Sequence, residues 1–428
     1  MPLRTSAAAL LLGTGCYAVV DPGQFRGSTD SPPPSVISVL PDQIHEGRGS
    51  ASGSPPAVVT FVLDSAAQAT PSVRSTDPKV RVDGVRLSED GLRVGVALRA
   101  EVRPDLSEGA SARFGLALDE GEPLALTLLG HDEAVFSGVV STVPSQLSEL
   151  TLAGARFVGD APLRVTVWGQ ASLRGPLVDL SATSTRAGPG GCRPGDGCLA
   201  DGEVGADANR GGGGGGSWVA EGGASGNVPG GVRAGVGDPS GAGGNGSSDG
   251  AALGGLGGAS GGRWVLDARG RSVFDGRVRA LGADGLDSPA CDAGGGGGGA
   301  GGGIVLAASM PWSSPGLSVE VGGGAGGGGQ GCGRRGGDGA DGLAYLVGDP
   351  TLGPTVLSDP FYAPTVRLSG PPGQQISYRV GAGPTQSSTL DGEGFGQVSL
   401  TETGEFCLVE PILGSNVACV TRFVGGAP

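Results

Sequence analysis

The stretch Gly-Arg-Trp-Val-Leu-Asp-Ala-Arg-Gly-Arg-Ser-Val-Phe-Asp-Gly-Arg-Val-Arg-Ala, residues 262–280, contains one complete structural unit. A short apolar run, a corner at Gly270 and a second run with apolar positions predict strand, corner, strand. Residues 162–180 repeat this order without a gap, and residues 303–321 repeat it with the second run shifted by one position. The matched positions of the first two blocks are Val165 with Leu266, Gly169 with Gly270, Leu173 with Phe274, and Leu177 with Val278. The unit therefore recurs, at an interval of about 40 residues between its last two copies.

Repeats of this length bury their apolar face only by stacking, so residues 149–350 are expected to form a Gly-rich parallel β-solenoid. Each turn would hold two strands and a Gly-rich return. Extended Gly chains in the polyproline-II geometry can hydrogen-bond backbone to backbone because no Cβ keeps them apart. The region resembles the polyglycine-II assemblies of phage tail-tip adhesins, cold-protective proteins and the glycine-rich domains of some receptor ectodomains. The fragment 217–220 resembles the first strand again. Residues 221–260 contain no clear strand pattern, so a long loop is an alternative for this segment.

The composition supports a special role for this region. The chain has 428 residues with 90 Gly and 31 Pro, and about 59 of the Gly lie between residues 181 and 350. Such composition is also typical of a disordered linker, but a linker has no reason to place apolar runs at a fixed interval. The net charge of −14, with Lys79 as the sole lysine, disfavours nucleic-acid binding. No run approaches the roughly 18 apolar residues of a membrane-spanning helix.

The N-terminus is expected to direct export. Residues 1–16 contain one early positive charge, a short apolar run and small residues, which is the pattern of a secretory signal. The end of this segment, Leu12-Gly13-Thr14-Gly15-Cys16, resembles a bacterial lipoprotein signal, although Gly13 stands where that family has Leu. The resemblance implies lipidation of Cys16 and a place in the outer membrane or at the cell surface of a Gram-negative bacterium. The alternative is ordinary signal cleavage near Ala18. Residues 17–35, rich in Pro and Gly, would then form a flexible tether.

The two flanks predict antiparallel sandwiches, so the expected fold class is all-β. In residues 36–148, short β-branched or alternating runs are separated by turn dipeptides such as Asp83-Gly84. Residues 351–428 show the same alternation. The runs expected to be strands are 36–40, 58–63, 92–98, 114–118, 365–368, 376–380, 396–400, 406–409 and 417–420. Both flanks resemble bacterial immunoglobulin-like surface domains.

Six cysteines remain when Cys16 is set aside, and an even number in an exported chain predicts disulfides. Proximity favours pairing Cys192 with Cys198, Cys291 with Cys332, and Cys407 with Cys419, although six cysteines allow 15 connectivities. A zinc site is disfavoured because such sites need tighter clusters or His partners, and the two His lie elsewhere.

Motifs for metal binding and catalysis are weak. Residues 336–344 match one nonapeptide of calcium-binding β-rolls, with Asp338 and Asp341 as candidate ligands. Those rolls bind each ion between tandem copies, and an Asp-Gly turn explains the single copy equally well. Asp179, Asp267 and Asp275 lie on or beside the repeat strands but at different template positions, so no pair of catalytic carboxylates converges.

These observations predict a non-catalytic envelope or cell-surface protein with a structural or adhesive role and no cofactor. Its partner would be an envelope or extracellular protein or a polysaccharide, and its lipid would bind the membrane. The alternative is a carbohydrate-active β-helix enzyme, a lyase or a glycosidase.

Overall fold

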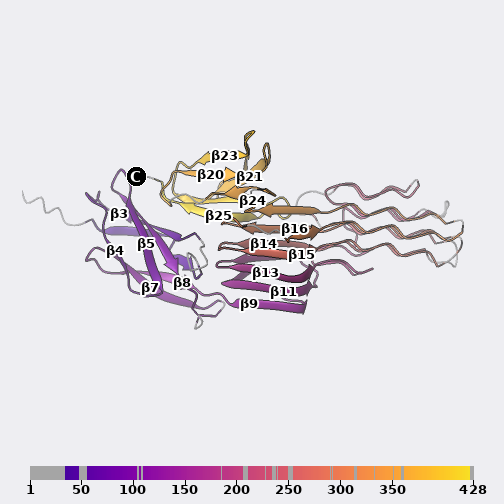
Figure 1. The fold of residues 1–428 in the computed structure, drawn as a ribbon, viewed down its shortest axis with the longest axis horizontal. Coiled ribbons are helices and arrows are strands. Elements are labelled where there is room, and N and C mark those ends of the chain that lie inside the picture. The colour runs from indigo at the N-terminus through magenta and orange to yellow at the C-terminus, as the bar shows by residue number, and fades with distance from the viewer. Residues whose placement is uncertain are drawn as a thin grey trace, which may run out of the picture.

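The computed structural model describes residues 34–47, 55–103, 106–107, 109–184, 186–205, 211–226, 228–233, 238, 240–248, 254–289, 291, 293–312, 316–331, 333–349, 351–357 and 361–424. The described chain is all-β and contains no helix (Figure 1). It accordingly has no helix long and apolar enough to cross a membrane. The expected signal segment, most of the tether and Cys16 lie outside the described residues.

The N-terminal part contains two four-stranded sheets that share one core. One sheet has the order β1 (Val36–Leu40), β3 (Ala57–Leu63), β6 (Arg93–Ala100) and β5 (Val80–Leu87). The other has the order β2 (Gln43–His45), β8 (Leu124–Leu129), β7 (Ser111–Leu118) and β4 (Val73–Ser75). Val59 and Phe61 on β3 meet Leu116 and Leu128 of the second sheet in this core. We call this part the N-terminal sandwich.

Two five-stranded parallel sheets form the middle of the molecule. The first sheet has the order β9 (Glu133–Val140), β11 (Glu149–Phe157), β13 (Ala171–Asp179), β15 (Val273–Arg279) and β17 (Ser318–Glu320). The second sheet has the order β10 (Gln146–Leu147), β12 (Leu163–Val167), β14 (Arg263–Ala268), β16 (Gly303–Ala308) and β18 (Leu343–Val347). Successive strands of the chain alternate between the two sheets, and the sheets enclose a common core that includes Leu173, Phe274, Leu266 and Leu306.

The repeat seen in the sequence appears as strand register. Val165 lies opposite Leu266, and Leu173 lies opposite Phe274. Val278, however, faces Val178 and not Leu177, because the register shifts between Gly175 and Val178. The third block continues both ladders, with Leu266 opposite Leu306 and Val278 opposite Val319.

Two features differ from the sequence expectation. β9 and β10 lie inside the range 36–148 expected for the first sandwich, yet they pair in parallel with β11 and β12. The fragment 217–220 forms a bend and not a strand, and Trp218 is buried against Ile412 and the parallel sheet. The Trp218-Val219 pair suggested a strand locally. In the structure, the Trp218 side chain instead fills the core between the second parallel sheet and the C-terminal module.

The Gly-rich segments run side by side away from the parallel sheets, on the side opposite the N-terminal sandwich (Figure 1). We call them the Gly-rich array; its described parts lie within residues 200–262, 280–302 and 321–342. The N–H groups of residues 294–302 donate to three neighbouring segments in strict rotation, at 2.7–3.2 Å. Residues 294, 297 and 300 bond to residues 247, 244 and 241; residues 295, 298 and 301 to residues 334, 337 and 340; and residues 296, 299 and 302 to residues 286, 283 and 280.

The carbonyl groups of the same run accept hydrogen bonds from three further segments. Their donors are residues 255, 258 and 261, residues 213 and 216, and residues 324 and 327. Six segments therefore surround the run 294–302, three bound through its N–H groups and three through its carbonyl groups. A period of three residues is that of the extended left-handed polyproline-II helix. Parts of residues 221–260, which have no strand pattern, belong to this hydrogen-bonded array.

The C-terminal module contains two small antiparallel sheets. One has the order β19 (Thr355–Val356), β20 (Thr365–Ser369) and β23 (Phe395–Ser399); the other has the order β22 (Gln386–Thr389), β21 (Gln375–Val380), β24 (Gly404–Val409) and β25 (Asn416–Arg422). This module packs on the outer face of the second parallel sheet, where Val265, Val305 and Val347 join its core. Because that sheet is buried on both faces, β14 and β16 are buried at every position. The sequence of β16 is apolar throughout, whereas β14 also buries the charged residues Arg263 and Asp267.

Candidate functional site

A pocket of about 580 Å³ opens where the N-terminal sandwich, the parallel sheets and the C-terminal module meet. We call it the junction pocket. Its first wall is the outer face of β3. Successive side chains of a strand point to opposite faces, so Val58, Thr60 and Val62 line the pocket while Val59 and Phe61 enter the core of the sandwich. Leu40, at the end of β1, is 64% exposed at this wall.

An aromatic stack forms the second wall. The ring of His45 lies parallel to Trp168, with 3.7 Å between ring centroids, and His131 stacks beside it at 5.1 Å from His45. Nδ1 of His45 and Nε2 of His131 are 2.8 Å apart and share one hydrogen bond. The indole N–H of Trp168 donates to Gln146 at 3.0 Å. Burial lowers the pKa of His131 because it disfavours the charged ring, and the nearby Asp132 carboxylate opposes the shift.

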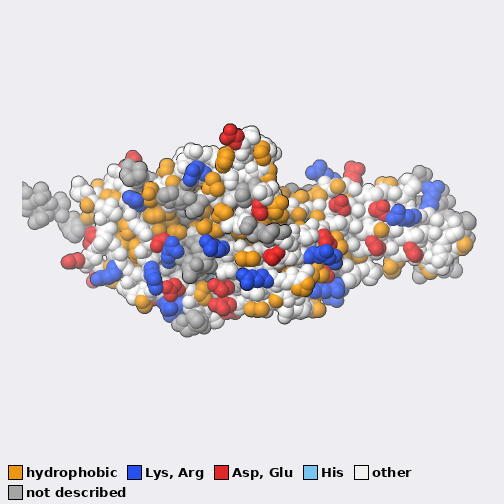
Figure 2. Space-filling view, viewed as in Figure 1, with side chains coloured by type: hydrophobic (Ala, Val, Ile, Leu, Met, Phe, Trp, Pro, Cys, Tyr) orange, Lys and Arg blue, Asp and Glu red, His pale blue; other side chains and the backbone are white. Residues whose placement is uncertain are grey.

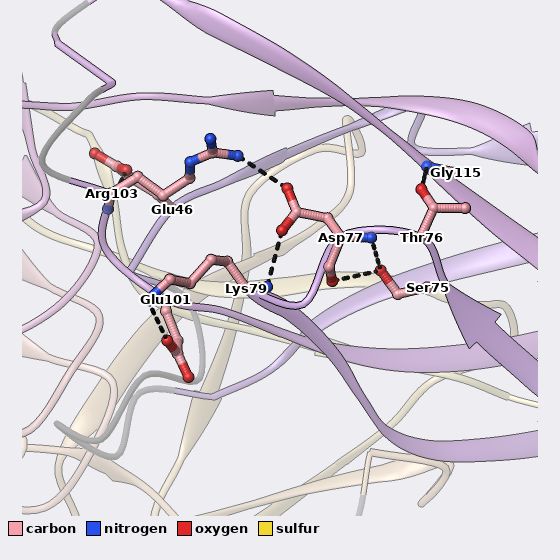
Figure 3. Close-up of polar contacts among 8 residues, drawn as sticks. All are labelled: Glu46, Ser75, Thr76, Asp77, Lys79, Glu101, Arg103 and Gly115. Carbon is pink, nitrogen blue, oxygen red and sulfur yellow. Dashed lines mark hydrogen bonds and ion pairs between the residues drawn. The ribbon is translucent and has the colours of Figure 1, made fainter.

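A buried carboxylate fixes the loop that carries this stack. Glu46 follows His45, and its carboxylate accepts the backbone N–H of His131 at 2.6 Å and that of Arg103 at 3.0 Å. Burial raises the pKa of Glu46, while these two hydrogen bonds lower it. Figure 3 shows the neighbouring contacts, in which the Arg103 guanidinium donates to Asp77 at 2.9 Å and the Lys79 side chain reaches Glu101. The Glu46 carboxylate, next to His45 in the chain, thus fixes the backbone of His131 and holds the two histidines close together.

The third wall belongs to the C-terminal module. Glu402 and Thr403 line the pocket from the bend before β24, Gly404 and Glu405 line it from the start of β24, and Thr421 lines it from β25. Arg93, at the start of β6, is the cationic side chain of the lining. The pocket is therefore apolar on the side of β3 and carries oxygen atoms and carboxylates on the opposite side.

A buried ion pair lies behind the pocket and joins the C-terminal module to β14. Asp267 accepts the backbone N–H of Ala418 at 2.8 Å, and its second oxygen lies 2.8 Å from the Arg269 guanidinium. Burial raises the pKa of Asp267, with Arg269 opposing the shift. Arg269 lies 5.5 Å over the Trp168 ring and 3.7 Å from Glu405, so this pair connects the aromatic wall to the wall formed by the C-terminal module.

The structure brings two of the three expected cysteine pairs together. Cys192–Cys198 and Cys407–Cys419 are disulfides, the second between the neighbouring strands β24 and β25. Cys291 is exposed, and its expected partner Cys332 lies outside the described residues. The two disulfides fit an oxidising, exported environment.

Asp338 and Asp341, the candidate calcium ligands, bind backbone groups of the array. Asp338 accepts the N–H of Gly326 at 2.8 Å and pairs with Arg335, and Asp341 accepts the N–H of Gly323 at 3.2 Å. From the other side, Asp284 and Asp287 accept the N–H groups of residues 325 and 328. These four carboxylates seal the outward N–H groups of residues 323–328, which leaves that edge closed to a further chain. Figure 2 shows charged side chains scattered over the otherwise white surface of the array.

Metal-ligating clusters among the described residues involve the disulfides. The two groups within ligand distance are Cys192, Cys198 and Asp201, and Glu405, Cys407 and Cys419. Disulfide sulfurs are not thiolates and do not bind metal ions as such. The Asp201 carboxylate also accepts the N–H groups of Cys198 and Ala242.

The repeat carboxylates lie apart. Asp179 is opposite Arg279 and Asp275 is opposite Arg174, in two different rows of the first parallel sheet. Asp267 belongs to the second sheet and is covered by the C-terminal module.

A scan against protein-family models and searches of curated proteins and of solved structures found no match for this chain.

Sequence reasoning missed the junction pocket. His45, His131 and Trp168 are far apart in the chain and none belongs to a recognisable motif. The one available signal was that both His of the chain lie outside the Cys-bearing part.

Proposed function

We propose that the protein is a non-catalytic component of the cell envelope or cell surface, with a structural or adhesive role. In this proposal the parallel sheets and the Gly-rich array form a polyglycine-II-type β-solenoid, and a lipid on Cys16 holds the protein at the outer membrane of a Gram-negative cell. Its partner would be an envelope or extracellular protein or a polysaccharide.

One observation carries the proposal: the array is a closed backbone hydrogen-bond network that points away from the N-terminal sandwich (Figure 1). A tether before residue 36 would enter at the sandwich, so the array would extend away from the membrane. The array also carries aliphatic side chains that are largely exposed, among them Leu199, Val204 and Val232. A stiff, distal, mostly uncharged surface suits contact with another surface better than turnover of a substrate.

The test is protease treatment of intact cells that express the full chain. We expect external protease to remove the array, and Cys16→Ser to abolish fatty-acid labelling and move the protein to the soluble fraction. Protection from protease until the outer membrane is opened would contradict surface display, and unchanged membrane association of Cys16→Ser would contradict the lipid anchor.

A further inference from the structure

We propose that the junction pocket is a binding site for an apolar ligand that carries a cationic nitrogen. The inference is independent of the display function, because strands β1, β3 and β6 of the N-terminal sandwich contribute to the pocket lining, and this sandwich lies on the opposite side of the parallel sheets from the array (Figure 1). Its volume of about 580 Å³ lies within the roughly 300–1,000 Å³ that small-molecule sites occupy. Its lining combines aliphatic side chains with polar and charged ones.

The apolar wall sets the body of the ligand. Val58 and Val62 of β3 and Leu40 of β1 present aliphatic side chains to the pocket. Leu40 is 64% exposed, so a bound apolar group would remove from water a side chain that the fold leaves open.

The opposite wall sets the charge of the ligand. Glu402 and Glu405 face the pocket, and no described residue forms an ion pair with Glu402. Arg93 in the lining offsets one carboxylate, and Arg269 behind the pocket is itself paired with Asp267. The three charged side chains of the lining, Glu402, Glu405 and Arg93, therefore carry one net negative charge, which favours an ammonium or guanidinium group over a carboxylate or phosphate.

The aromatic wall argues against a sugar as the occupant. A sugar ring would pack its C–H face on an aromatic ring, but His45 already covers Trp168 at 3.7 Å, and Arg269 lies over the same ring system at 5.5 Å. His45 and Arg269 thus occupy the Trp168 ring on which a sugar would stack. An aliphatic or small aromatic amine needs only the β3 wall and the carboxylates.

The test is titration calorimetry of the full chain with three probes that share one apolar body: hexylammonium, hexanol and hexanoate. We expect hexylammonium to bind most tightly and hexanoate most weakly. Glu402→Gln should weaken hexylammonium binding by about tenfold and leave hexanol binding unchanged, since it removes the unpaired charge and little volume.

A blocking variant locates the site. Gly404 lines the pocket and a Cβ built on it meets no heavy atom within 4 Å, so Gly404→Leu adds volume at the lining without a clash at its Cβ. Gly392→Leu is the matched control, because its Cβ is equally free and Gly392 does not line the pocket. We expect Gly404→Leu to abolish hexylammonium binding and Gly392→Leu to retain it, with both variants melting as the parent does. Equal binding of hexanoate, no binding of any probe, or unchanged binding in Gly404→Leu would overturn the proposal.

Discussion

Gly297 shows how closely the backbones of the array approach one another. Its N–H donates to Gly244 at 2.8 Å and its carbonyl accepts from Gly258 at 2.8 Å. A Cβ at this position would overlap the carbonyl oxygen of Gly214 and lie 2.6 Å from its carbonyl carbon. Neither atom belongs to a side chain that could rotate away, so the position requires Gly.

We therefore predict that Gly297→Val disrupts the array, because a branched side chain would separate backbones that now bond directly. The measurement is hydrogen exchange of residues 294–306, which should be strongly protected in the parent and lose about 3 kcal/mol or more of protection in the variant. Gly392→Val, whose Cβ meets nothing within 4 Å, serves as the control and should leave this protection intact. Exchange of the parent at the rate of a free peptide would refute the ordered array.

His131 makes the stability of the N-terminal sandwich depend on pH. Burial lowers the pKa of the folded ring below its unfolded value of about 6.5, so its contribution is present above that pH and is lost as the pH falls. The groups around it are His45, at 2.8 Å, Asp132 next in the chain, and Glu46, which holds its backbone N–H.

We predict that the parent loses more stability between pH 7.5 and 5.5 than His131→Gln does. One proton taken up on unfolding gives a slope of at most about 1.4 kcal/mol per pH unit. Urea unfolding of both proteins at the two pH values measures the difference, in which groups common to both cancel. His45→Gln, which also removes the hydrogen bond but keeps the buried ring, separates loss of the pair from loss of the titrating group. If the free energy of unfolding changed equally with pH in the parent and in His131→Gln, burial of this ring would not account for the loss of stability at low pH.

At the scale of elements, strands were predictable where their signal is local. The runs at 36–40, 365–368 and 376–380 became β1, β20 and β21 within one residue, because alternation and turn residues act over a few positions. The sequence repeat also predicted the register of β12 with β14, because residues that align between two copies of a repeat lie opposite each other when the copies stack. The break at Gly175 was not predictable, because a bulge depends on how two strands meet.

Features that depend on distant contacts could not be predicted. β9 was not among the runs expected to be strands, and its place in the first parallel sheet depends on its pairing with β11. The junction pocket needs residues from three parts of the chain, and nothing local distinguishes Glu402 or Trp168 from ordinary surface or strand residues. The same holds for Asp338 and Asp341, whose spacing suggested calcium but whose carboxylates bind backbone N–H groups of a segment adjacent in space.

At the scale of the whole molecule, the second parallel sheet joins the parts into one unit. Its inner face completes the core with the first parallel sheet, and its outer face completes the core of the C-terminal module. Trp218, from the base of the array, lies in that outer core with Val265 and Ile412. The array and the C-terminal module thus share one core on the outer face of this sheet.

This arrangement predicts that the chain cannot lose its C-terminal module without consequence. A chain that ends at residue 350 would expose Val265, Val305 and Val347, which are now fully buried, together with the Asp267 oxygen whose partner N–H belongs to Ala418. We expect it to bind a hydrophobic dye and to self-associate, because a contiguous apolar face of this kind is not stable in water. Size-exclusion chromatography and dye fluorescence measure both effects, and a chain that ends at residue 424 is the control. Trp218 lies between the two parts, so we also expect hydrogen exchange at the base of the array to increase in the shorter chain. A monomeric shorter chain with the parent's protection at residues 294–306 would mean that the array and the parallel sheets form an independent folding unit, contrary to the shared core.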